Sequence, residues 1–181
     1  MNHADPADVE LDLLINLFFR QPDDLGQFEE VSSEQLPTCE QNLLAHDHHM
    51  TVTLEEHHGS LVNVHVLDSQ SEGDSYSRKI LLSKQSDGNV VQFGIVRLDL
   101  SVLEPEVRTA IESQQTPLGR ILIEHNVLRE VKLLHLYKIV AGPELAESFG
   151  YSIGQICYGR TALIYCNGSP GVELLEIVGN C

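Results

Sequence analysis

Two alternating segments joined by a turn decide the fold: YSRKILLSKQSDGNVVQFGIVRLDL, residues 76–100. Residues 76–83 and 90–100 have the composition and alternation of β-strands. The Asp87-Gly88 pair between them is a strong signal for a type I′ hairpin turn. If these two residues are the centre of the turn, antiparallel register places Arg78 opposite Arg97 on one face of the sheet.

This expected arginine pair requires a counter-ion, because like charges directly opposite each other destabilise a sheet. Asp99 falls on the same face, diagonal to Arg78, so an ordinary salt bridge is one interpretation. A dicarboxylate ligand held between the two arginines is the other.

The rest of the chain predicts further antiparallel strands and several helices. Strands are expected at 51–56 and 61–68 as a hairpin, at 128–140, and at 158–166 and 172–178 as another hairpin. Helices are expected at 8–19, 40–45, 105–111, from Pro117 and at 143–149. Residues 1–38 are predicted to form an N-terminal helix and polar loop, and 39–181 a single domain. The fold class is α+β, with about six antiparallel strands and the helices packed on one face.

The composition excludes several classes of partner. The chain has 27 acidic and 11 basic side chains, a net charge of −16, so neither nucleic acid nor an anionic membrane is expected to bind it. The apolar run at 13–19 is too short to span a bilayer and lacks the flanks of a signal peptide. We expect a cytoplasmic monomer or small homo-oligomer. No CxxC pair occurs, so we expect no disulfide among Cys39, Cys157, Cys166 and Cys181.

Histidines are concentrated in AHDHHMTVTLEEHH, residues 45–58, which holds five of the nine. On the expected strands the adjacent pairs His48-His49 and His57-His58 would point to opposite faces, which does not suit a metal site. No HExxH, GxSxG, P-loop or GxGxxG motif is present. We therefore expect no metal and no cofactor, with solvated histidines at a hairpin rim. A metal-dependent enzyme that uses this segment remains an alternative.

The stretch TPLGRILIEHN, 116–126, predicts a helix start that meets a small anion. Thr116 and Pro117 suit the N-cap and first helical position. Gly119 costs about 1 kcal/mol relative to alanine in a helix, which suggests that something approaches its backbone closely. Helix-start amides together with Arg120 suit a small carboxylate.

Glu176 lies in VELLEIV, where alternation groups it with Val172, Leu174 and Val178 on one face. A carboxylate at the centre of a sheet requires either an arginine partner or a functional role. An edge strand that leaves Glu176 in solvent is the other interpretation.

The order of these motifs resembles the chorismate pyruvate-lyase family over roughly residues 40–178. The residues that carry the resemblance are HMT (49–51), Arg78 in YSRKILL, the strand glycine Gly94, TPLGR (116–120), YGR (158–160), NGSP (167–170) and Glu176. The resemblance implies an antiparallel sheet with helical flaps over a small buried pocket. It also implies conversion of chorismate to 4-hydroxybenzoate and pyruvate without a cofactor. A non-catalytic aromatic-acid binding module is the alternative, because fold does not fix function.

The resemblance also implies site residues. Met50 and Cys157 would contribute backbone contacts, Gly119 and Arg120 would line the site, and Glu176 would contact the hydroxyl of the aromatic ring. Family members of the ubiquinone pathway carry an arginine directly after the strand glycine, where this chain has Ile95. The expected register offers Arg97, with Arg78 opposite it, as the replacement. The expected catalytic residues are Glu176 and Arg97, and the expected binding residues are Arg78, Met50, Gly119, Arg120 and Cys157.

Overall fold

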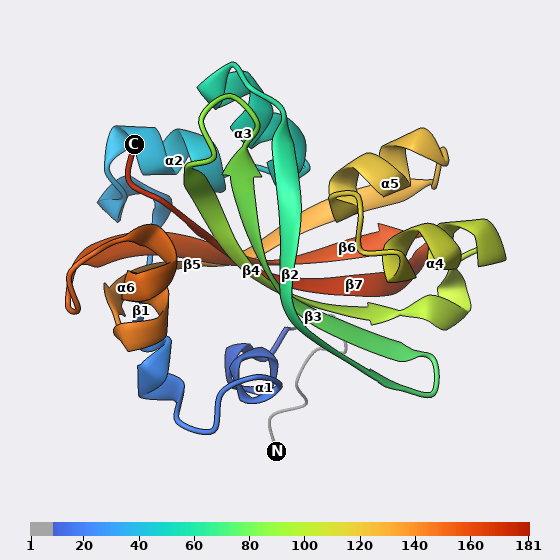
Figure 1. The fold of residues 1–181 in the computed structure, drawn as a ribbon, viewed down its shortest axis with the longest axis horizontal. Coiled ribbons are helices and arrows are strands. Elements are labelled where there is room, and N and C mark those ends of the chain that lie inside the picture. The colour runs from blue at the N-terminus through green and yellow to red at the C-terminus, as the bar shows by residue number, and fades with distance from the viewer. Residues whose placement is uncertain (1–8) are drawn as a thin grey trace.

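The structure is a computed structural model and describes residues 9–181 (Figure 1). The described residues form one antiparallel sheet of seven strands in the order β1-β5-β6-β7-β4-β3-β2. The strands are β1 (Gly26–Val31), β2 (Val62–Glu72), β3 (Ser75–Lys84), β4 (Val90–Asp99), β5 (Arg129–Ala141), β6 (Ile156–Cys166) and β7 (Ser169–Val178). The α+β class and the antiparallel sheet are confirmed, with one strand more than expected.

Helices cover both faces of the sheet, so the expectation of helices on one face is wrong. The helices are α1 (Leu11–Asn16), α2 (Thr38–Leu44), α3 (Met50–His58), α4 (Pro105–Glu112), α5 (Leu118–Glu124) and α6 (Pro143–Phe149). The α2–α3 pair and the α4–α5 pair each pack a core on one face, and α1 and α6 pack on the other. Figure 1 shows α3 and α5 over the same face of the sheet. We call this face the α3–α5 face.

Two predicted segments have a different structure. Residues 51–56 belong to helix α3 and not to a strand, so β2 pairs with β3 instead. The buried residues Met50 and Thr51 both lie about one helical turn before the buried Leu54, so the three share one face of α3. Within the predicted polar loop, β1 pairs with β5 at the edge of the sheet. The predicted helix at 8–19 begins outside the described residues, and α1 covers its central part.

The β3–β4 hairpin is confirmed, but its register is shifted by one residue. The Lys84 amide donates to the Asn89 carbonyl, and Val91 is an extra residue between the pairs Leu82–Gln92 and Ser83–Val90. Arg78 therefore pairs with Val96, and Arg97 pairs with Ser77. Because side chains alternate between faces, Arg78 lies on the α3–α5 face and Arg97 on the opposite face. The predicted face-to-face arginine pair is wrong.

Cys39 and Cys181 form a disulfide, so the expectation of no disulfide is also wrong. They are 142 residues apart in sequence, with Cα atoms 6.2 Å apart. The fold brings them together because α2 and the segment after β7 lie at the same end of the sheet (Figure 1). Cys157 and Cys166 are buried free thiols.

Candidate functional site

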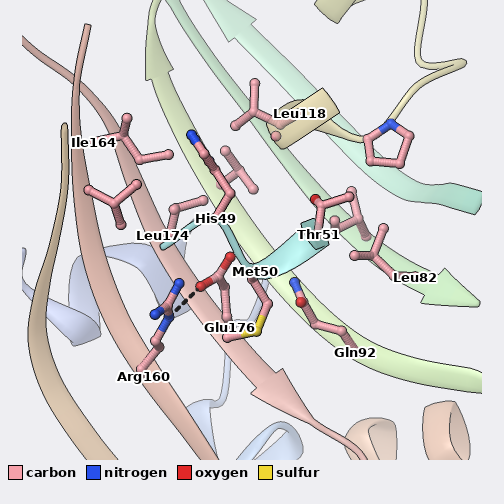
Figure 2. A pocket seen from close by; sticks show the side chains of 15 residues that line it. His49, Met50, Thr51, Leu82, Gln92, Leu118, Arg160, Ile164, Leu174 and Glu176 are labelled. Atoms are coloured by element: carbon pink, nitrogen blue, oxygen red, sulfur yellow. Dashed lines mark hydrogen bonds and ion pairs between the residues drawn. The ribbon is translucent and has the colours of Figure 1, made fainter. Parts of the chain in front are cut away.

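A buried cavity lies between the α3–α5 face of the sheet and the starts of α3 and α5 (Figure 2). Its volume is about 40 Å³. The helices contribute His49, Met50, Thr51, Pro117, Leu118 and Gly119, and the sheet contributes Ile80, Leu82, Gln92, Val96, Val131, Arg160, Ile164, Leu174 and Glu176. The walls are mostly apolar, and the polar groups come from a few positions.

Glu176 and Arg160 form a buried ion pair at one end of the cavity. They are cross-strand partners on β7 and β6, and Arg160 Nε lies 2.7 Å from Glu176 Oε2. Their side chains are 8% and 1% exposed. The buried-carboxylate interpretation of Glu176 is correct, and its arginine partner is Arg160.

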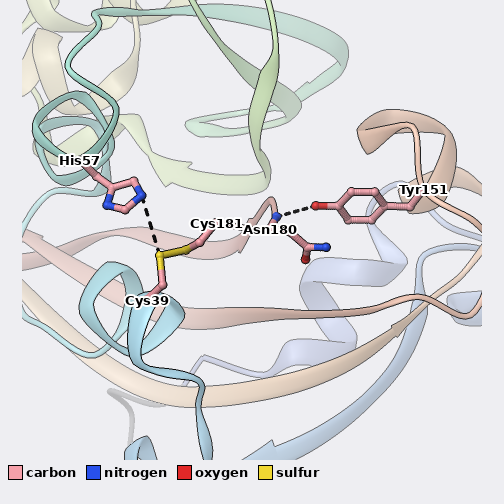
Figure 3. Close-up of a disulfide and its surroundings, with 5 residues drawn as sticks. All are labelled: Cys39, His57, Tyr151, Asn180 and Cys181. Atoms are coloured by element: carbon pink, nitrogen blue, oxygen red, sulfur yellow. Dashed lines mark hydrogen bonds between the residues drawn. A yellow bond between two sulfur atoms is a disulfide. The ribbon is translucent and has the colours of Figure 1, made fainter.

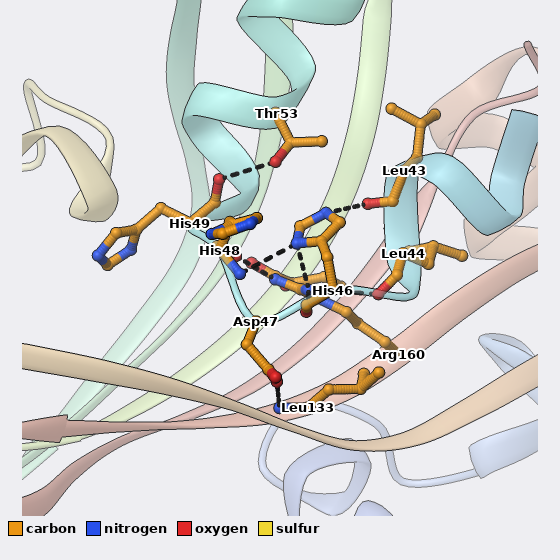
Figure 4. Close-up of polar contacts among 10 residues, drawn as sticks. Leu43, Leu44, His46, Asp47, His48, His49, Thr53, Leu133 and Arg160 are labelled. Atoms are coloured by element: carbon orange, nitrogen blue, oxygen red, sulfur yellow. Dashed lines mark hydrogen bonds and ion pairs between the residues drawn. The ribbon is translucent and has the colours of Figure 1, made fainter. Parts of the chain in front are cut away.

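Arg160 also fastens the loop between α2 and α3 (Figure 4). Nη1 donates to the carbonyl oxygens of Leu44 (3.3 Å) and His46 (2.8 Å), and Nη2 donates to that of His48 (3.1 Å). The guanidinium is thus coordinated by one carboxylate and three carbonyls. Arg160 therefore positions the start of α3, which forms the roof of the cavity.

His46 and His49 remain neutral in this loop. Burial, followed by the positive charge of Arg160, lowers the pKa of His46. Burial, followed by the charge of Arg129, lowers the pKa of His49 to about 4. Arg129 Nε donates to His49 Nε2 at 2.7 Å, as a neutral ring permits. His49 separates the cavity from an outer surface groove that Arg129 also lines.

Arg78 is a buried arginine without a carboxylate partner among the described residues. It is 0% exposed, and its Nη1 makes a long hydrogen bond of 3.4 Å to the Ile111 carbonyl. Nε and Nη2 have no hydrogen-bond partner within residues 9–181. Burial lowers the pKa of Arg78, an effect that the neighbouring Tyr76 side chain partly offsets, and guanidinium groups stay charged in proteins. Arg78 adjoins the cavity, because its strand neighbour Ile80 and its cross-strand partner Val96 both line it.

Gln92 is a second buried polar side chain with an unused atom. It is 3% exposed and lines the cavity from β4, two residues before Gly94, the cross-strand partner of Glu176. Its Oε1 accepts no hydrogen bond within residues 9–181. Buried polar atoms are satisfied in nearly all native structures, so Gln92 and Arg78 make this face a candidate binding surface.

The start of α5 makes direct contact with α3. A Cβ atom at Gly119 would lie 2.9 Å from Thr51 Oγ1, so Gly119 permits the two helix starts to touch. The close approach expected at this glycine is present, and it is made by Thr51. Arg120 was also expected to line the site, but it is not among the residues that line the cavity, because its side chain forms an ion pair with Glu55 of α3. These two contacts hold the starts of α3 and α5 together.

Two of the expected site residues, Arg97 and Cys157, lie on the other face, as does Ile95. Arg97 forms an ion pair with Glu173, its cross-strand partner, and not with Asp99, whose side chain accepts from Ser101. The side chain of Cys157 packs in the core beneath α1 and α6, as does Ile95, which is 0% exposed. In this register, an arginine at position 95 would point away from the cavity. Arg97 therefore does not replace it.

Sequence reasoning placed Met50, Gly119 and Glu176 at one site, and all three line the cavity. It missed Arg160, Gln92 and His49 as lining residues. Arg160 is the arginine of the YGR motif, and its position in an alternating strand was a signal that could have placed it at the site. The pairing with Glu176 depends on the β6–β7 register, which contains a bulge between Ile164 and Tyr165.

Comparisons with known proteins show the fold. No family model and no curated protein sequence matches the chain. The effector domain of PhnF from Mycobacterium smegmatis is 9% identical over 72% of this chain and 87% of that domain, with a TM-score of 0.51. The ligand-binding domain of a putative GntR-family transcriptional regulator from Bordetella bronchiseptica is 16% identical over 66% of this chain and 85% of that one, with a TM-score of 0.47.

A possible transcriptional regulator, YydK from Bacillus subtilis, is 14% identical over 65% of this chain, with a TM-score of 0.46. The match spans 57% of the YydK chain, less than two thirds of its length. The fold of this protein is the chorismate-lyase-like α+β fold that such regulator domains share. Within residues 9–181, none of the helices has the length and hydrophobicity to cross a bilayer.

Proposed function

We propose that this protein is a binding module for a small aromatic carboxylic acid, which it takes up in the cavity on the α3–α5 face. The single observation that carries the proposal is Arg78, whose buried Nε and Nη2 have no partner among the described residues. An uncompensated buried charge is strongly destabilising, whereas a carboxylate accepts from two guanidinium N–H groups in a bidentate pair. A ligand carboxylate supplies both the charge and the acceptors.

The opposite end of the cavity suits a hydroxyl group. Glu176 and the unused Oε1 of Gln92 are acceptors there, and the walls between are apolar. Glu176 and Arg78 are separated by two strand spacings and two residues along the strand, which is about 12 Å between their Cα atoms. With side chains reaching inward from both ends, this span fits a ring that carries a carboxylate and a para hydroxyl.

The cavity must enlarge before an aromatic ring enters. Its volume is about 40 Å³, while an engineered cavity that binds benzene measures about 150 Å³. The contacts that must loosen join α3 to α5, namely the Gly119–Thr51 contact and the Arg120–Glu55 ion pair. Ligand exchange is then slow, because release requires the same opening.

The comparisons support binding more than catalysis. The Mycobacterium smegmatis protein is described as an effector domain and the Bordetella bronchiseptica protein as a ligand-binding domain. Identities of 9% and 16% carry only the fold, so the ligand class here rests on the cavity of this chain.

Titration calorimetry with a matched ligand set tests the proposal. We expect 4-hydroxybenzoate to bind more tightly than benzoate, which lacks the hydroxyl, and 4-hydroxybenzyl alcohol, which lacks the charge, to bind weakest. Equal affinity for the acid and the alcohol would contradict a carboxylate site.

Conversion of chorismate to 4-hydroxybenzoate and pyruvate is the second candidate function, and the position of Glu176 in the cavity favours it. The hydrogen on the ring carbon that bears the hydroxyl, next to the ether carbon, moves to the enol methylene, the bond between the ether oxygen and the ring breaks, and the ring aromatises as pyruvate leaves. Atoms balance without a cofactor, so the protein has only to position the substrate and stabilise the developing charge. Incubation with chorismate, followed by mass detection of both products, tests this candidate. If the products form at the same rate with and without the protein, the lyase activity is excluded and the binding proposal stands.

A further inference from the structure

A cluster of soft metal-binding atoms lies outside the cavity, at the end of the sheet where the chain segment after β7 meets α2 (Figure 3). Cys39 comes from α2, His57 from the last turn of α3 and Cys181 from the segment after β7. One ligand atom from each of the three lies within 4.8 Å of the other two. In the structure the two sulfur atoms form a disulfide.

The disulfide alone does not account for His57. The imidazole Nε2 points at Cys39 Sγ from 3.8 Å, and a sulfur atom is only a weak hydrogen-bond acceptor. Bond lengths of about 2.3 Å to sulfur and about 2.0–2.1 Å to nitrogen give tetrahedral zinc ligands a separation of about 3.6 Å. The nitrogen–sulfur distance here is close to that value. His57 therefore already holds the position of a third ligand.

We propose that, when the disulfide is reduced, Cys39, His57 and Cys181 bind one Zn²⁺, with the fourth position open to water. Two thiolates and an imidazole are the donor set that zinc prefers, and three protein ligands with an open position are typical of non-structural zinc sites. The disulfide and the zinc complex are alternative states of the same two sulfur atoms.

The chemistry of the interconversion balances with a thiol or phosphine as the reductant. The reductant supplies two electrons, the sulfur–sulfur bond breaks, and each sulfur gains a proton to become a thiol. Zinc then binds as the two thiols release these protons, so binding strengthens as pH rises. Cys181 is exposed. Zinc binding requires the two sulfur atoms to move apart from bonding distance to the larger separation of two ligands on one metal ion.

The other two cysteines do not compete for the metal. Burial raises the pKa of Cys157 to about 12 and that of Cys166 to about 11, so neither offers a thiolate near neutral pH. Both lie in cores of the sheet, away from this cluster. Charge-transfer absorption from thiolate to a bound metal therefore shows that Cys39 and Cys181 are the ligands.

Zinc would join three elements that the disulfide joins only in part. The disulfide links α2 to the segment after β7, whereas His57 adds α3, whose first residues form the roof of the cavity. The proposed zinc site therefore joins both α2 and α3 to the segment after β7 at the end of the sheet. The metal site stands independently of what the cavity binds.

Titration of the full chain without a histidine tag tests the proposal. Protein reduced with a phosphine is titrated anaerobically with Co²⁺, whose sulfur-to-metal charge-transfer absorption reports thiolate ligands, and the Co²⁺ is then displaced with Zn²⁺. We expect one equivalent per chain and no such signal from the oxidised protein. His57→Ala should weaken Zn²⁺ binding by more than the roughly 10- to 100-fold that follows loss of an outer partner of a ligand. His58→Ala, on the same helical turn, is the matched control and should bind as the unmodified protein does.

Several outcomes would overturn the proposal. They are a reduced protein that binds no stoichiometric Zn²⁺, an oxidised protein that binds it equally well, and a His57→Ala variant that binds as tightly as His58→Ala. Cys39→Ser and Cys181→Ser should each abolish the charge-transfer band. If either serine variant fails to fold, thermal melting of the reduced unmodified protein with and without Zn²⁺ decides, and an unchanged melting temperature counts against the site.

Discussion

Arg160 and Glu176 face each other across β6 and β7 and form an ion pair of 2.7 Å inside the protein. The same guanidinium donates to three carbonyls of the loop that leads into α3. One arginine therefore fixes both the carboxylate at the end of the cavity and the loop that forms its roof. We therefore predict that loss of Arg160 disrupts both features together.

Arg160→Met should destabilise the protein by about 3–5 kcal/mol, because it leaves the Glu176 carboxylate buried without its partner. Urea unfolding measures this change. Glu176→Gln keeps an acceptor for Arg160 and should cost less, while weakening binding of a ligand hydroxyl. If Arg160→Met cost no more than a surface substitution, about 0.5 kcal/mol, the ion pair would not hold the site together.

The neutral histidines give stability a specific pH dependence. His49 has a pKa of about 4 when folded and about 6.5 when unfolded, so between these values the unfolded chain binds more protons. Stability due to neutral His49 is fully present above pH 6.5 and is lost as pH falls toward 4. Discounted for partial solvation, this loss is about 1–2 kcal/mol.

His49→Gln retains an acceptor for Arg129 without a titrating ring, so its unfolding free energy should fall less between pH 7 and pH 4. Urea unfolding at several pH values measures the difference. His125→Gln, at an exposed position, controls for the loss of a histidine. Identical slopes for His49→Gln and the unmodified protein would show that His49 does not carry this effect.

Gly119→Ala should destabilise the contact between α5 and α3 by about 1–3 kcal/mol, because the new Cβ would lie 2.9 Å from Thr51 Oγ1. Adding Thr51→Ala removes that oxygen and should restore part of the loss. A double-mutant cycle of unfolding free energies measures the coupling. Simple additivity of the two substitutions would mean that the helix starts do not depend on this contact.

The sequence predicted the β3–β4 and β6–β7 hairpins because strand alternation and turn residues are local signals. It did not predict the extra residue at Val91, and this bulge moved Arg97 to the other face. Bulges and edge strands such as β1 depend on what packs against them, and sequence periodicity does not report that.

The candidate site shows the same division between local and tertiary information. A buried carboxylate at Glu176 follows from the apolar residues around it, and the close packing at Gly119 follows from the cost of a helical glycine. The identity of each partner, Arg160 and Thr51, needed the register and the helix packing. The disulfide partners Cys39 and Cys181 lie 142 residues apart, a distance over which no local pattern operates.

Calorimetric titration of 4-hydroxybenzoate into Arg78→Met and Arg97→Met tests most directly whether Arg78 binds the carboxylate of a ligand. Arg97 is the matched control, since it sits nearby on the same hairpin but on the opposite face, in an ion pair with Glu173. We predict that Arg78→Met weakens binding by about 2–4 kcal/mol, roughly 30- to 1,000-fold, with no loss of stability of the free protein. Arg97→Met should leave the affinity unchanged. Unchanged affinity in Arg78→Met, or an equal loss in both variants, would contradict the account.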